Sequence, residues 1–224
     1  MRPDYLDLLD DDVRALFRQV ERNAGVRIEF VDDEKLNFGG PTGQGMLRVR
    51  VDPLPVRIYV PTNGYFSNGA LWHELSHVRR ARIDSVPFIT SVHGYANELD
   101  NAVEHLFIVP EEIARYPERI SHWELDAHKF WEEKVPKMSG KVLPELDICV
   151  NWLFLHHALP DSSMIRVARH FIDNHVNLML KIEHISKEAS EFLENGKKSE
   201  LVYLLFDQFS EIAAVNELEL EYKT

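Results

Sequence analysis

Cysteine is almost missing from this sequence, because its 224 residues include only Cys149. One cysteine cannot form an intramolecular disulfide, which excludes a disulfide-stabilised secreted domain and favours a reducing compartment. Cys149 lies in an apolar run, so we expect it to be a buried and unreactive core residue.

Long apolar segments and an excess of positive charge are also lacking. No uninterrupted apolar stretch is long enough for a membrane span, and the first residues, MRPDYLDLLDDD, lack the basic start and apolar run of a secretory signal. The net charge of -12 argues against an extended nucleic-acid surface, and we interpret Arg79, Arg80 and Arg82 as a solvated helix face. These absences predict a cytoplasmic protein that binds neither membrane nor nucleic acid.

The first third of the chain combines one helix with short strands. Residues 4–22 carry apolar side chains at helical spacing, with acids early and arginines late, which predicts an amphipathic helix. Three short segments with β character follow at 26–30, 46–51 and 56–60.

The stretch LWHELSHVRR, residues 71–80, carries the strongest functional signal. An apolar stripe predicts a helix here, capped by Ser67 or Asn68. His73 and His77 would then lie one turn apart on one face, where both imidazoles can reach one zinc ion. Glu74 could act on a water activated by that ion, as in the H-E-x-x-H arrangement of metallopeptidases. The alternative is a coincidental motif with two merely hydrogen-bonded histidines in a helical interaction module.

The remainder of the chain is predicted to be mainly helical. After a connector at 83–94, apolar spacing predicts a helix over 95–109, and Pro110 is expected to begin a new short helix. Residues 216–224 are expected to fray. Further helices are predicted at about 121–135, 143–158, 162–187 and 199–215.

A catalytic zinc ion usually has three protein ligands and one water, so a third protein ligand is required besides the two histidines. The helix at 95–109 offers Glu98 and Glu104. Glu98 lies in the first turn, where the helix dipole already explains an acid. Glu104 follows Asp100 by one turn, a like-charged pair that needs a compensating cation, so Glu104 is the preferred third ligand and Glu98 the alternative. His105 is expected to be a supporting hydrogen-bonding group.

The motif and the order of elements before it resemble the zincin metallopeptidases. A glutamate ligand would make the chain gluzincin-like, similar to small intracellular members that cleave a repressor protein. The thermolysin-type pattern N-E-x-x-x-D is incomplete, because Asn97 and Glu98 are followed by Ala102 at the aspartate position. The resemblance implies an α+β fold in which a small N-terminal sheet and the active-site helix (1–85) precede a mainly helical C-terminal subdomain with the third ligand (86–224).

The activity that this resemblance implies is zinc-dependent hydrolysis of a peptide bond in a protein or peptide substrate. His73, His77 and Glu104 would bind Zn²⁺, and Glu74 would act as general acid/base. Residues 57–60 would present an open strand edge to an extended peptide. The alternative function is a catalytically silent zincin-fold regulatory or binding protein. A second stabiliser of the oxyanion is left open among His93, Tyr95, His122, His128, His156 and His157.

Overall fold

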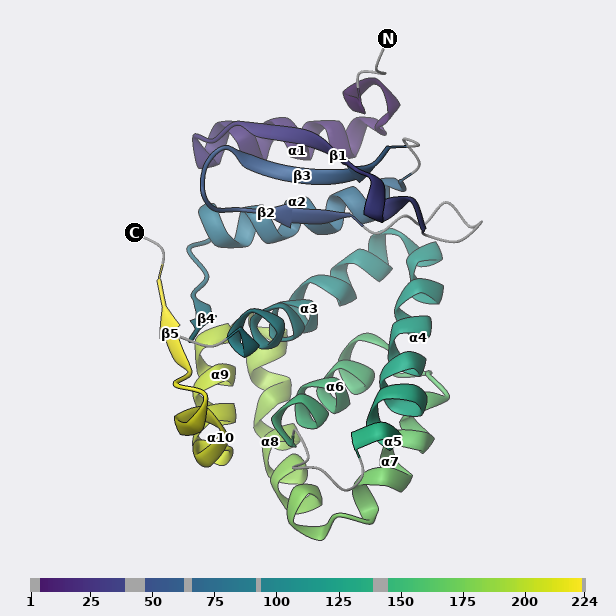
Figure 1. Cartoon of the computed structure of the whole chain (residues 1–224), viewed down its shortest axis with the longest axis vertical. Coiled ribbons are helices and arrows are strands. Elements are labelled where there is room, and N and C mark those ends of the chain that lie inside the picture. Colours follow the sequence, from purple (N-terminus) through teal and green to yellow (C-terminus); the bar gives the residue numbers. More distant parts are fainter. Residues whose placement is uncertain (1–4, 39–46, 63–65, 92–93, 139–144, 223–224) are drawn as a thin grey trace. The chain divides into compact units, whose positions relative to one another are not determined.

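The computed structural model describes residues 5–38, 47–62, 66–91, 94–138 and 145–222. The chain forms two compact units (Figure 1). The first unit comprises Met1–Val86, Arg115–Arg119 and Lys223–Thr224, and the second comprises Pro87–Ala114 and Ile120–Tyr222. A small mixed sheet with helices comes first and a mainly helical part follows, so the predicted α+β class is confirmed.

The first unit packs two helices with a three-stranded sheet. The first helix ends at Gly25, whose left-handed backbone (φ 62°) lets its N–H bond the carbonyl of Glu21. The core of the unit is built from Val13 and Phe17, from Ile58, and from Leu71 and Leu75 on the second helix. The elements are α1 (Asp11–Ala24), β1 (Ile28–Asp33), β2 (Arg48–Arg50), β3 (Val56–Pro61) and α2 (Asn68–Arg82), with 3₁₀ turns at Tyr5–Leu8, Glu34–Phe38 and Pro117–Arg119.

The strand order is β1-β3-β2, which corrects the expectation of an open edge at residues 57–60. Strand β3 is central, because Ile58 pairs with Phe30 of β1 in parallel and with Val49 of β2 in antiparallel fashion. The expectation was wrong because β2, although only three residues long, covers that side of β3. Within the described residues, the edge next to β3 is therefore formed by β2.

The second unit gathers its helices around a core of its own, which includes Leu99, Leu106 and Leu155. Cys149 belongs to this core and is fully buried, and burial raises the pKa of its thiol, as expected of an inert residue. The elements are β4 (Phe88–Thr90), α3 (Tyr95–Arg115), α4 (Ile120–His128), a π-helical segment (Lys129–Lys134), α5 (Val135–Met138), α6 (Glu145–Ala158), α7 (Met164–Asp173), α8 (Val176–Glu194), α9 (Lys198–Gln208), α10 (Ser210–Val215) and β5 (Glu219–Glu221).

Two predicted helix boundaries were wrong. Helix α3 continues through Pro110, because the buried Val109 and Glu112 pack the turns on both sides and this packing outweighs one lost backbone hydrogen bond. The helix predicted over 162–187 is instead divided into α7 and α8. Asn174 bonds the carbonyl of His170 with its side-chain amide and so competes with continuation of the helix.

The connector at 83–94 and the tail at 216–224 each contain a strand that the sequence did not predict. Strands β4 and β5 pair in antiparallel fashion, with Ile89 opposite Leu220. The hydroxyl of Ser91 donates to the carbonyl of Asn216, 125 positions later. Among the described helices, none is long and apolar enough to cross a membrane.

Candidate metal centre

Helix α2 carries the H-E-x-x-H motif and begins at a capped end. The backbone N–H of Ala70 donates to the side-chain oxygen of Ser67 at 3.1 Å, so the expected Ser67 cap is present. Leu71 and Leu75 of this helix are fully buried in the first core. The cap and the packed face fix both the start and the rotation of α2.

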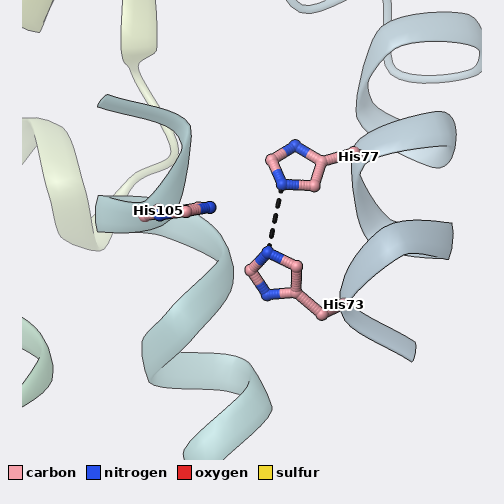
Figure 2. Close-up of side chains that lie close together, drawn as sticks. All are labelled: His73, His77 and His105. Atoms are coloured by element: carbon pink, nitrogen blue, oxygen red, sulfur yellow. Dashed lines mark hydrogen bonds between the residues drawn. The ribbon is translucent and has the colours of Figure 1, made fainter. Parts of the chain in front are cut away.

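His73 and His77 project from α2 toward each other (Figure 2). Their Nε2 atoms are 3.1 Å apart and their rings meet edge to face at 74°. His73 is buried, with 5% of its surface exposed. The spacing of the motif therefore brings the two nitrogens to one point, which sequence reasoning predicted from helical periodicity.

The separation of these two nitrogens matches a shared metal ion. Zinc–nitrogen bonds of about 2.05 Å at a tetrahedral angle place two ligand nitrogens about 3.3 Å apart. The observed 3.1 Å between His73 and His77 is close to that value. The two imidazoles thus fit a divalent metal with minimal rearrangement.

Glu74 follows His73 in the buried part of α2, with 9% of its surface exposed. A neighbouring position on an α-helix is rotated by about 100°. The side chain of Glu74 therefore projects from α2 to one side of the two histidines rather than in line with them. This is the placement that a proton-transfer group requires next to a metal site, whereas a third ligand must come from another element.

His105 is carried by α3 of the second unit and packs there against Trp123, with 5.0 Å between ring centroids. The indole N–H of Trp123 donates at 3.0 Å to the carboxylate of the fully buried Glu112. Figure 2 draws His105 with the two α2 histidines. Among the described residues, His73, His77 and His105 each offer a ring nitrogen that could bind a metal ion.

Sequence reasoning placed His105 in a supporting role because it is next to Glu104, the preferred third ligand. The Glu104 preference depended on a missing cation beside Asp100, and that cation is present. The ammonium of Lys198 contacts Asp100 at 2.6 Å and Glu104 at 2.7 Å, and its side chain is only 1% exposed. The like-charged pair on α3 is therefore compensated without a metal ion. Glu98 is exposed in the first turn of α3.

The residues considered as a second oxyanion stabiliser lie on several elements, and His122 of α4 packs against Trp123 with 4.9 Å between ring centroids. Burial and the neighbouring Asp147 raise the pKa of the Tyr95 phenol, which hydrogen-bonds that carboxylate. His128 pairs with Glu132 on the surface at 2.8 Å. His156 and His157 lie on α6, and His93 lies outside the described residues.

Comparisons of the chain with protein-family models, with curated proteins and with solved structures find no match.

Proposed function

We propose that this chain is a zinc-dependent peptidase in which His73 and His77 bind the metal and Glu74 is the general acid/base. The observation that carries the proposal is the 3.1 Å separation of the two Nε2 atoms on α2. A buried carboxylate at the next helical position accompanies them. Two imidazoles one turn apart with an adjacent glutamate are the working parts of an H-E-x-x-H hydrolase.

For the third ligand we favour His105 over Glu104 and Glu98. Three histidines that leave a fourth position open are an established donor set for catalytic zinc. The contact between Glu104 and Lys198 at 2.7 Å gives that carboxylate a structural role in α3. The choice of His105 therefore replaces the ligand preferred from sequence, and the gluzincin-like assignment gives way to a three-histidine site.

The bound zinc would supply Lewis acidity and lower the pKa of a water molecule toward neutrality. Glu74 accepts a proton from the attacking water and returns it to the leaving amine of the cleaved peptide. Burial of His73 and Glu74 restricts bulk water and strengthens the electrostatic interactions at this point. An extended substrate would add to the sheet along β2, which is an edge strand of the three-stranded sheet.

Metal analysis of protein purified without a histidine tag tests the ligand set. We expect about one zinc per chain in the parent and loss of zinc in His73→Ala and His77→Ala. His105→Ala should lose zinc while Glu104→Gln retains it. His184→Ala is the matched control, because His184 lies on the surface of α8 beside Glu188. Zinc retained by both α2 variants would refute the site.

Cleavage is tested with Glu74→Gln, which should still bind zinc. Proton transfer by such a group contributes roughly 10²–10⁴-fold to the rate. Labelling of new peptide amino termini in a proteome incubated with parent or variant should therefore show products with the parent alone. Identical labelling by two zinc-loaded proteins would favour the catalytically silent binding protein.

A further inference from the structure

Helices α6, α7 and α8 of the second unit enclose a pocket of about 540 Å³. Its size lies within the range of sites that bind small organic molecules. All of its lining residues belong to the second unit, and none is part of the H-E-x-x-H helix. The pocket is therefore separate from the helix of the proposed peptidase site.

One wall of the pocket is apolar and includes a large aromatic surface. Trp152, Leu153, Ile172 and Ile182 line it, and each is less than 10% exposed. The ring of Trp152 lies 4.1 Å from that of His156. This wall is suited to a flat ring, because aromatic groups gain from stacking in addition to the area they bury.

The polar side of the pocket is poorly suited to a charged ligand. Arg169 already pairs with Asp173 at 2.7 Å and lies 3.7 Å from Glu183. Loss of solvent lowers the pKa of His156 and of His157, so both rings are neutral at pH 7 and each offers one donor and one acceptor. Lys187 lies at the exposed rim, where a single ion pair adds little.

The hydroxyl group of Ser186 has no hydrogen-bond partner among the described residues. Its side-chain oxygen is buried, and the described part of the chain supplies no hydrogen bond to it. Buried hydroxyl groups are almost always hydrogen-bonded, because leaving one unpaired costs free energy. Ser186 lines the pocket, so a polar group of a bound molecule would satisfy it.

We propose that this pocket binds a small uncharged aromatic molecule that carries a hydrogen-bonding group. The aromatic ring packs against Trp152 and the apolar wall, and the polar group bonds Ser186 and the neutral imidazoles. Asp173 and Glu183 already neutralise Arg169, which excludes strong selection for an acid. The occupant is thus a neutral heterocycle or a similar ring compound rather than a carboxylate or an amine.

Fluorine NMR with 5-fluoroindole tests the proposal on the full chain. We expect a saturable shift or broadening of the ligand's fluorine signal, and proton–nitrogen NMR should show a perturbed indole N–H signal of Trp152, assigned by its absence in Trp152→Phe. Indole-3-acetate and tryptamine, which add a negative and a positive charge, should compete less well than indole. Tighter binding of either charged compound, or no binding of the fluorinated probe, would overturn the proposal.

Ser186→Leu adds a bulky side chain to the pocket and removes the hydroxyl, and it should weaken binding by at least about tenfold. Asn177→Leu adds the same side chain at an exposed position of α8 and should leave binding unchanged. Ser186→Ala, which keeps the helix and removes only the oxygen, should weaken binding less than Ser186→Leu but measurably. Affinity unchanged in both Ser186 variants would contradict the assignment.

Discussion

Replacing Lys198 by methionine should destabilise the second unit more than any other single loss of a charge described above. The ammonium group of Lys198 lies between Asp100 at 2.6 Å and Glu104 at 2.7 Å, with its side chain 1% exposed. Methionine keeps a long apolar side chain but leaves two carboxylates one helical turn apart without their cation. Removing one partner of a buried ion pair costs about 3–5 kcal/mol. We expect a loss of that size in the free energy of unfolding at pH 7.

Urea denaturation followed by circular dichroism, with metal removed by chelation, measures this loss. Lys181→Met is the matched control. Lys181 contacts Glu145 at 3.0 Å, but both side chains are about one-third exposed, so its loss should cost less than about 1 kcal/mol. Restoring charge balance with Asp100→Asn and Glu104→Gln in the Lys198→Met background should recover most of the stability, because no buried charge is then left unpaired.

The pH dependence of this stability loss follows from the protonation of the Asp100 carboxylate. Burial raises its pKa above the ordinary value, so the folded state holds the proton more tightly than the unfolded state. This contribution to stability is present below about pH 4 and is lost as pH rises through the raised pKa. Removing the Lys198 charge raises that pKa further. The variant should therefore approach the parent at acid pH and diverge as pH rises. A loss below 1 kcal/mol, or one independent of pH, would refute the reasoning.

Two further predictions concern packing. Gly69→Ala should lower the free energy of unfolding by about 1–2 kcal/mol. A Cβ at this position would lie 2.9 Å from Cγ of the buried Arg119, and this overpacking outweighs the gain in helix propensity. Gly94→Ala is its control, because a Cβ there meets no atom within 4 Å, and thermal unfolding of both variants should show a lower midpoint for Gly69→Ala alone. Cys149 should react with a thiol reagent only after unfolding, because burial removes its thiol from solvent and raises the thiol pKa. Modification of the native protein at the rate of a free thiol would contradict this buried position.

Local signals in the sequence predicted the local parts of the fold. The Ser67 cap and the apolar stripe located α2, and helical periodicity brought His73 and His77 together, because each depends on residues within a few turns. The α+β class followed from the order of such segments. These features required no knowledge of remote contacts.

What the sequence did not predict depends on residues far apart. The partner of Asp100 is Lys198, 98 positions away, so the charge pattern of α3 was attributed to a metal. Strands β4 and β5 are three residues each, which is too short for periodicity to distinguish them from loops. His105, which we propose as a ligand, had no spacing signal either, because it lies on another helix than His73 and His77.

The pairing of β4 with β5 also has a consequence during synthesis on the ribosome. Residues up to Val86 supply the sheet and both packed helices of the first unit, which can begin to fold as soon as they emerge. The segment Phe88–Thr90 emerges directly afterwards, yet its partner strand Glu219–Glu221 is translated much later. That backbone must stay unpaired while α3 through α10 are made, and completion of the second unit is therefore delayed until Glu219–Glu221 has been translated.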